Sequence, residues 1–376
     1  MLQQEKTIKF DNNGQFRIMH ITDTHMEDDN IDASLWLIEE ACKRECPNIA
    51  IVTGDNVLNF DEPSKTKRYI DRLMEVFRKY GIAAAVTFGN HDSETGALSR
   101  EELMLYYSSF DCHVKNSEEK KPFSGGTYNV PVLSSDEKSI KFNLWVFDSG
   151  DYDKEGHYGC MSKEDVLWYM KKSDELKNNN GGHAVYSLAF QHIIVPEVYD
   201  ALKLTKKRKL YSFSHMYNKN DYYMFDPDVT NYGTLNETPC CGYENFGQFD
   251  AMVEKGDVLA VFSGHDHTNA FGVRHKGIDI VNSLSTRSQS DRFSSQYGYR
   301  IIELDENDIS EYTTRVERWY NMFTLSDIKA IKRSGDKYGV KIASGVKFRG
   351  LIQRFMTKVG RVFCHIVTGR KNTYKH

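Results

Sequence analysis

Residues that could bind metal ions occur in five short groups along the chain. The groups are Asp23 with His25, Asp55, Asn90 followed by His91 and Asp92, His192, and His265 with His267. Carboxylate, amide oxygen and imidazole suit divalent ions such as Zn, Mn and Fe. Brought together, side chains of these types would form a polynuclear metal site.

Each group comes directly after a short apolar run. The runs are Phe16–Ile21, Ile49–Thr53, Ile82–Phe88, Ala184–Phe190 and Val258–Ser263. In layered α/β proteins, ligands collect at the carboxyl ends of the strands, so five such ends can deliver the groups to one edge. A glycine precedes Asp55, Asn90 and His265, as expected where the backbone turns sharply out of a sheet.

The elements between these groups predict a layered α/β fold. Helical patterns at 31–45 and 63–80 alternate with the first three runs, giving a β-α-β-α-β order. The second half contains candidate strands and helices, with the last two strand segments completing a second sheet: 127–133, 140–147, a helix capped by Ser162, a helix at 248–254, 271–281 and 297–304. Residues 205–245 are polar, rich in Tyr and Asn, and without a clear period, which predicts a functional or disordered loop.

The five groups, in this order, resemble the motifs of the calcineurin-like metallophosphoesterase superfamily. The matching motifs are Asp23-Thr24-His25, Gly54-Asp55, Gly89-Asn90-His91-Asp92, His192 and Gly264-His265-Asp266-His267. Each motif alone recurs by chance, but the ordered set across residues 16–270 is specific. Three further stretches resemble the purple-acid-phosphatase-like branch: Leu144–Tyr152, Leu188–Glu197 and Ser263–Asn269.

The resemblance implies a fold and a metal centre. The fold is a four-layer α/β/β/α sandwich of two mixed sheets. The centre holds two divalent ions (Mn, Fe or Zn): one is bound by Asp23, His25 and His267, the other by Asn90, His192 and His265, and Asp55 bridges them.

The resemblance also implies a mechanism. A hydroxide bridging the ions attacks a phosphate ester, because metal binding brings the pKa of water toward about 7. His91 assists the leaving group, and Asp92 is expected to hold the His91 imidazole in place. Asp266 is assigned a weaker role in orienting its flanking ligands.

Two departures from the purple acid phosphatases limit the analogy. The tyrosinate that gives them their colour stands three residues after the aspartate of the second motif, a position occupied here by Leu58. They also lack the histidine of the first motif, which is His25 in this chain. The resemblance therefore implies a calcineurin-type site and not a ferric-tyrosinate one.

Alternative interpretations exist for the residues and for the function. Taken singly, Asp23 could cap a helix, His192 could be a surface histidine and Asn90 a turn residue. If none of the five groups bound metal, their shared position after apolar runs would require five independent coincidences, so the pattern favours metal binding. A phosphomonoesterase is the favoured function; a phosphodiesterase or nuclease on the same centre, or a non-catalytic metal-binding scaffold, are alternatives.

The substrate-facing rim must come from loops. The candidate segments are Asp148–Tyr158, Tyr211–Tyr243 and Arg287–Tyr299. The aromatic residues of the long 205–245 stretch could stack on an aryl leaving group, but we expect them to pack the loop down. His20 is expected to face the core.

Composition is that of a soluble globular protein, with 40% hydrophobic and 27% charged residues in 376. Seven scattered cysteines indicate reduced thiols and not a disulfide framework. The chain shows no signal-peptide pattern and no apolar run long enough to span a membrane, so we expect a cytoplasmic protein.

The C-terminal segment differs from the rest in charge. We predict a phosphoesterase domain over 1–325 and a basic, helical tail over 326–376. Residues 328–376 contain thirteen Lys or Arg and a single acidic residue, Asp336. Within it, 349–370 has the spacing of a basic amphipathic helix. Such a helix can dock on its own domain or on an anionic membrane surface, and nucleic acid is a third option.

Overall fold

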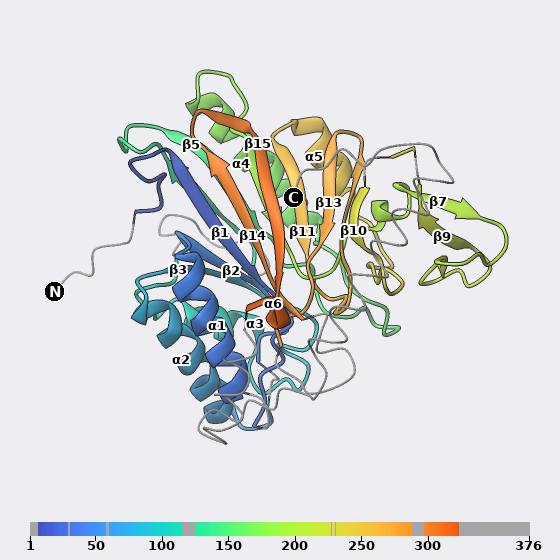
Figure 1. Ribbon diagram of the computed structural model, residues 1–376, viewed down its shortest axis with the longest axis horizontal. Coiled ribbons are helices and arrows are strands. Elements are labelled where there is room, and N and C mark those ends of the chain that lie inside the picture. Colours follow the sequence, from blue (N-terminus) through green and yellow to red (C-terminus); the bar gives the residue numbers. More distant parts are fainter. Residues whose placement is uncertain are drawn as a thin grey trace.

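The computed structural model in Figure 1 describes residues 7–28, 31–57, 60–114, 125–226, 228–229, 231–287 and 297–322. Leu58 and the predicted basic helix at 349–370 lie outside these residues. The division of the chain near residue 325 therefore stays a prediction.

The first sheet has five strands in the order β15-β14-β1-β2-β3. They are β1 (Gln15–Ile21), β2 (Ile49–Thr53), β3 (Ala83–Thr87), β14 (Gly298–Asp305) and β15 (Asp308–Arg318). β1, β2 and β3 are parallel, whereas β14 is antiparallel to β1 and β15 is antiparallel to β14. All residues of β2 and β3 are buried, so these strands read as continuous apolar runs and not as alternating ones.

The second sheet has seven strands in the order β10-β12-β13-β11-β6-β5-β4. They are β4 (Tyr128–Leu133), β5 (Ile140–Val146), β6 (Ser187–Phe190), β10 (Asn231–Thr234), β11 (Val258–Ser263), β12 (Ala270–His275) and β13 (Ile278–Asn282). The four central strands β13, β11, β6 and β5 are parallel. The outer strands β4, β12 and β10 are antiparallel to their neighbours.

Helices flank the two sheets. Helices α1 (Ile31–Glu45) and α2 (Pro63–Lys79) connect the parallel strands of the first sheet and pack on each other. Helices α2 and α3 (Arg100–Tyr107) also contact β3. Helix α4 (Lys163–Asn179) starts after the predicted cap Ser162, whose hydroxyl accepts from the Asp165 N–H, and packs on α5 (Gln248–Lys255). Among the residues described here, no helix is long and apolar enough to cross a membrane.

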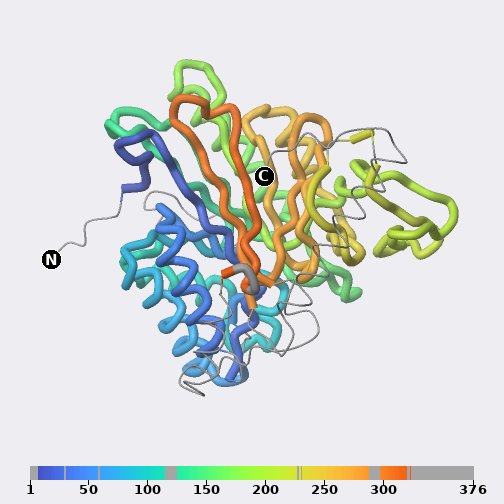
Figure 2. The backbone as a smooth tube through the Cα atoms, viewed as in Figure 1, coloured from blue at the N-terminus to red at the C-terminus, as the bar shows by residue number. Residues whose placement is uncertain are grey.

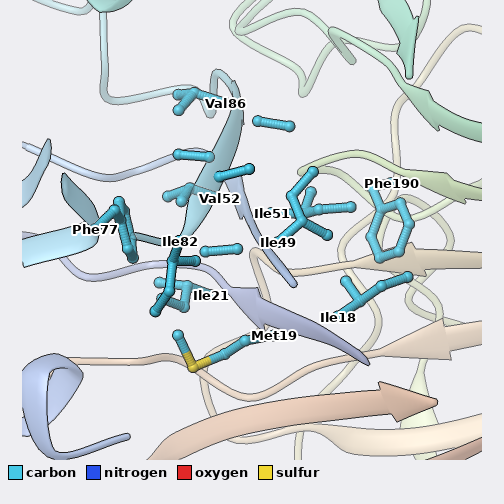
Figure 3. Close-up of a cluster of buried hydrophobic side chains, with 14 of the residues drawn as sticks. Ile18, Met19, Ile21, Ile49, Ile51, Val52, Phe77, Ile82, Val86 and Phe190 are labelled. Carbon is cyan, nitrogen blue, oxygen red and sulfur yellow. The ribbon is translucent and has the colours of Figure 1, made fainter. Parts of the chain in front are cut away.

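Opposite faces of the seven-stranded sheet pack against different layers. Leu144, Phe190 and Phe262 lie in the hydrophobic core that also contains Ile18 and Ile51 of the first sheet, and Figure 3 shows Ile18, Ile51 and Phe190 within it. The intervening residues of the same strands, such as Trp145 and Ala189, pack on the other face with Tyr169 of α4. The order is helices, sheet, sheet, helices, which confirms the predicted four-layer sandwich of two mixed sheets.

One predicted strand was assigned to the wrong sheet, and another strand was not predicted. The segment predicted at 297–304 belongs to the first sheet as β14, because it pairs with β1, for example Ile302 with Ile18. β15 was not predicted at all. Five residues of β15 are exposed, and among the described residues it pairs with β14 alone. Sheet membership depends on long-range pairing, which the order of segments alone does not reveal.

The stretch predicted as an aperiodic loop forms strands instead. β7 (Leu202–Thr205), β8 (Phe213–Ser214) and β9 (Tyr222–Phe225) make a separate three-stranded sheet, and β10 joins the seven-stranded one. We call residues 202–225 the wing, because they project from the body at the right of Figure 1, as the tube in Figure 2 also shows. The short turn η1 (Pro196–Val198) precedes the wing, and α6 (Trp319–Met322) follows β15.

Candidate metal centre

The five groups singled out in the sequence all follow strands of the two packed sheets. Asp23 and His25 follow β1, Asp55 follows β2 and Asn90 follows β3, whereas His192 follows β6 and the His265/His267 pair follows β11. β1, β2 and β3 are mutually parallel, as are β6 and β11, so their carboxyl ends share one edge in each sheet. Contacts between ligands from the two sheets show that these edges meet.

Several of these residues adopt backbone conformations that residues other than glycine usually avoid. Asp23, His25, Asp55 and His265 have φ values of 53°, 40°, 49° and 68°. A non-glycine residue in this left-handed region costs about 1–3 kcal/mol when strained, and such residues concentrate at functional sites. The surrounding structure therefore holds four candidate ligands in conformations that local preference does not favour.

The glycines of the motifs allow loops to approach each other closely. A Cβ at Gly89 would clash with the Asp55 carboxylate, and one at Gly264 would clash with Thr22 and Asp23. Gly54 combines such a clash with a φ of 98°. The sharp-turn explanation therefore holds for Gly54, whereas Gly89 and Gly264 are required by crowding between loops.

The first ligand group consists of Asp23, His25 and His267. Their ligand atoms lie within 4.8 Å of one another. His25 Nε2 is 3.0 Å from His267 Nε2 and 3.8 Å from Asp23 Oδ1, and His267 Nε2 is 3.4 Å from the same oxygen. These are the three residues that the resemblance assigns to one metal.

The second group consists of Asp55, His192 and His265, again within 4.8 Å. Asp55 Oδ2 is 3.3 Å from His192 Nε2 and 3.5 Å from His25 Nε2. Asp55 therefore faces both groups at once, as a bridging carboxylate would.

Three buried atoms at this site have no hydrogen-bond partner among the described residues: Asp23 Oδ1, Asn90 Oδ1 and His192 Nε2. The other end of each side chain is held. Asp23 Oδ2 accepts from the Thr22 hydroxyl and the His265 N–H, and the Asn90 amide nitrogen donates to Tyr152 across 2.7 Å. His192 Nδ1 donates to the Thr53 carbonyl across 2.9 Å, which leaves Nε2 facing the site.

Buried polar atoms are normally paired, so these unpaired atoms require an explanation, and two of them, Asp23 Oδ1 and His192 Nε2, lie 3.9 Å apart. An oxygen and nitrogen donor set of this kind fits divalent transition metals. The residues present therefore fit a metal centre.

Mutual interactions shift the pKa values of these side chains strongly. Burial raises the pKa of Asp23, but His192, His25 and His267 outweigh it and hold that pKa well below the usual range. Burial lowers the pKa of His192, but Asp55 and Asp23 outweigh it and raise that pKa to about 9. Carboxylates that stay ionised at neutral pH provide the negative charge that cations need.

His91 lies beside the site without belonging to either ligand group. Its ring centroid is 5.5 Å from that of His25, and its side chain is 33% exposed. Its Nδ1 lies 2.6 Å from Glu94 Oε2. The residue therefore has the access to solvent that a leaving-group donor needs.

The expected contact between Asp92 and His91 is not found. The Asp92 carboxylate instead accepts hydrogen bonds from the backbone N–H groups of Gly89, Asp55 and Asn56. It is buried beneath the loops, and burial together with Asp55 raises its pKa to about 6. Asp92 thus ties the Asp55 loop to the Asn90 loop, while Glu94 holds the imidazole.

Asp266 also differs from its expected role. Its carboxylate accepts from the Cys240 N–H and from the Asn269 amide, each across 3.1 Å, and does not contact the imidazoles on either side. Burial, then Glu237, raises its pKa to about 7. Asp266 therefore attaches the loop at Cys240 to the edge of the site.

Other supporting residues were missed because they carry no motif. Arg100 of α3 is partly buried, donates to the Gly89 carbonyl across 2.7 Å and pairs with Asp148, which fixes the turn before Asn90. Ser285 Oγ donates to the Asp23 carbonyl across 2.6 Å. His20 lies in the core as expected, between Ser283 Oγ and the hydroxyl of Thr53.

Aromatic side chains from two of the predicted rim segments surround the site. Tyr158 packs edge-on against His265, with centroids 4.3 Å apart, and Tyr152 stacks on Tyr158. His157 stacks on Tyr243 at 4.2 Å. Most of the third segment, at 287–299, lies outside the described residues.

A family model for calcineurin-like phosphoesterases matches residues 16–269. The chain belongs to this family. The match contains every candidate ligand of the metal centre, so the resemblance drawn from the motifs is confirmed.

Named proteins similar to this calcineurin-like chain come from Arabidopsis thaliana. "Probable inactive purple acid phosphatase 29" is 24% identical over 94% of this chain and 91% of its own length. "Probable inactive purple acid phosphatase 28" is 26% identical over 72% of this chain and 70% of its own. A solved structure of a dimetal phosphatase from Danio rerio is 12% identical, with a TM-score of 0.46 over 80% of this chain and 98% of its own.

Proposed function

We propose that this protein is a dinuclear-metal-dependent phosphoesterase that favours phosphomonoesters. The observation that carries the proposal is that Asp55 joins two groups of candidate ligand atoms, in which the buried Asp23 Oδ1 and His192 Nε2 have no hydrogen-bond partner among the described residues. Family membership supports a phosphate ester as the substrate.

The proposed ligands fall into two sets around a shared carboxylate. Asp23, His25 and His267 would hold one ion, Asn90, His192 and His265 the other, and Asp55 both. Two divalent ions bound there would bring the pKa of a water toward about 7 and neutralise charge on the phosphate. The metal identity within Mn, Fe and Zn is left open by this donor set.

His91 is proposed to protonate the leaving-group oxygen. Because Nδ1 is bonded to the Glu94 carboxylate, Nε2 is the ring nitrogen free to give up a proton. General acid assistance of this kind contributes about 10²–10⁴ in rate. Glu94 would act by orienting the ring.

The neighbouring tyrosines would shape the entrance. The Tyr152 hydroxyl accepts from the Asn90 amide and so would fix the orientation of the Asn90 side chain. Tyr158 packs on His265 and limits how that ring can rotate.

Two other functions remain as alternatives. The names of the two Arabidopsis relatives contain the words "probable inactive", which favours a metal-binding scaffold as the second candidate. A phosphodiesterase or nuclease would use the same ligands and differ only at the rim.

The test is hydrolysis by the purified full chain after reconstitution with Mn, Zn or Fe. We expect p-nitrophenyl phosphate to be cleaved faster than bis-p-nitrophenyl phosphate. A preference for the diester would replace the monoesterase by a phosphodiesterase. Bound metal without cleavage of either ester would favour the scaffold.

A further inference from the structure

The tip of the wing presents two large apolar side chains to solvent. Leu210 is 79% exposed and Tyr211 is 70% exposed. Both lie inside a turn closed between Lys209 and Ser212, where the Ser212 N–H donates to the Lys209 carbonyl across 3.1 Å. The turn therefore points these side chains outward.

The conformation of the turn makes a tyrosine unexpected there. Tyr211 has a φ of 63°, a region that glycine or asparagine adopts more readily than a bulky aromatic residue. A strained, exposed aromatic at the apex of a turn has no evident structural role in the wing. Such strain points to a function for the side chain.

Basic residues surround this apolar tip. The wing contains six Lys or Arg and one acidic residue, in a chain whose net charge is −4. Four of the basic residues, Lys206 to Lys209, directly precede Leu210, and all four are exposed. The wing is thus strongly cationic on a protein that is slightly anionic.

A pocket of about 380 Å³ lies at the base of the tip. Arg208 and Lys219 supply its charges, and its other lining residues include the hydroxyl-bearing Ser212, Ser214 and Tyr222. Guanidinium, ammonium and hydroxyl donors together suit a phosphate group.

The wing is attached firmly to the body. Phe225 of β9 packs on Phe271 of β12, with centroids 5.9 Å apart, and Tyr223 packs on Tyr199 at 4.8 Å. The Tyr217 hydroxyl donates to the Cys241 carbonyl across 2.9 Å. These aromatic residues pack the segment down, as expected, whereas Tyr211 does not.

We propose that the wing docks the protein on an anionic phospholipid membrane. Leu210 and Tyr211 enter the headgroup region, the lysines face the anionic surface, and the pocket binds the phosphate of a lipid headgroup. Binding of this kind draws on buried apolar area and on electrostatic attraction, which contributes about 1 kcal/mol for each basic residue near the surface.

The shape of the tip favours a membrane over other partners. A protein interface needs a patch that buries roughly 1,000 Å² or more, whereas this tip is the narrow apex of one turn. Nucleic acid would use the basic residues but would leave the aliphatic Leu210 without a role. A lipid surface uses both features.

Docking through the wing would bring the candidate metal centre close to the membrane. Thr238 lines the pocket, and the adjoining chain contacts the loop that holds His267: the Thr268 N–H donates to Glu237, and the Cys240 N–H donates to Asp266. The docking proposal does not depend on whether the centre is catalytic.

The experiment is sedimentation of the full chain with vesicles of phosphatidylcholine, with and without phosphatidylserine. The test variant combines Leu210→Ser with Tyr211→Ser, and its matched control combines Leu105→Ser with Leu167→Ser, which are 61% and 58% exposed outside the wing. A second variant combines Arg208→Ser with Lys219→Ser. Its control combines Lys138→Ser with Lys171→Ser, whose side chains are 82% and 80% exposed.

We expect binding only to vesicles that contain phosphatidylserine, weakened by salt and by about tenfold or more in each wing variant. The two controls should bind like the unmodified chain, and all variants should keep the same melting temperature. If the wing variants still bind the vesicles, the lipid contact lies elsewhere, for example in the basic tail, and the proposal is overturned. Absence of vesicle binding, or tighter binding to single-stranded RNA that the Leu210/Tyr211 variant retains, would also overturn it.

Discussion

His91 Nδ1 lies 2.6 Å from Glu94 Oε2, so the imidazole beside the candidate metal centre is held by a glutamate three residues later in the chain. The sequence had predicted that Asp92 would hold this imidazole. Glu94 orients the histidine, and Asp92 joins the loops that carry the candidate ligands Asp55 and Asn90.

Replacing His91 by Ala should slow hydrolysis while leaving the bound metal unchanged. We expect turnover to fall by about 10²–10⁴ because a proton donor is lost. Elemental analysis and steady-state kinetics with p-nitrophenyl phosphate provide the two readouts. The control is His183→Ala, at an exposed position. Unchanged turnover in the His91 variant would refute its assigned role.

Replacing Glu94 by Gln should have a smaller effect that depends on the leaving group. The amide can still accept from Nδ1 but carries no charge, so the hydrogen bond that orients the ring for proton donation is weaker. We expect about a tenfold loss with an alkyl phosphate and a smaller loss with p-nitrophenyl phosphate, whose leaving group needs little protonation. Glu101→Gln, at an exposed position in α3, is the matched control. Equal losses with both substrates would show that Glu94 does not act through proton transfer.

Replacing Asp92 by Asn should destabilise the protein. Both carboxylate oxygens accept backbone N–H groups, so an amide nitrogen would face a donor from Gly89, Asp55 or Asn56. One mismatched buried donor costs about 1–3 kcal/mol. We expect a lower melting temperature and weaker metal retention than in Asp111→Asn, a substitution at an exposed position. A variant with unchanged stability and metal content would contradict the loop-holding role.

The contact between α1 and α2 should make stability depend on pH in a defined direction. Hydrogen bonds from Lys79 and Tyr80 lower the pKa of Glu39 from 4.5 to about 2. Because the folded-state pKa is depressed, the stabilisation is complete above pH 4.5 and is lost as pH falls toward 2.

Glu39→Gln tests this dependence. The side chain is partly exposed, so we expect a loss of about 1 kcal/mol or less in the free energy of unfolding at pH 7. Urea unfolding should show this difference shrinking between pH 4.5 and about 2. A difference that grows on acidification would have the wrong sign.

That the candidate ligands come together could be predicted from the sequence, because they follow continuous apolar strands. β2 and β3 are buried on both faces, so the change from apolar residues to Asp55 or Asn90 marks a strand end unambiguously. Parallel strands then bring such ends together without any further information.

The sequence did not predict features that depend on long-range partners. β14 lies beside β1 because Ile302 pairs with Ile18, a contact that no local pattern encodes. The strands of the wing are short, and β9 is half-buried at every residue, so no alternation marks it. The role of Asp92 was missed because its partners are backbone N–H groups, which are the same in every residue type.

The metal stoichiometry of the full chain is the most direct test of the proposed dinuclear centre. Asp55 Oδ2 lies 3.5 Å from His25 Nε2 and 3.3 Å from His192 Nε2, so this side chain connects the two ligand groups. Elemental analysis after reconstitution and gel filtration should find two ions per chain in the unmodified protein, and fewer in Asp55→Ala, while the exposed-site control Asp111→Asn keeps both. A chain that retains no metal under these conditions, or an Asp55→Ala variant that retains both ions, would contradict the proposed dinuclear centre.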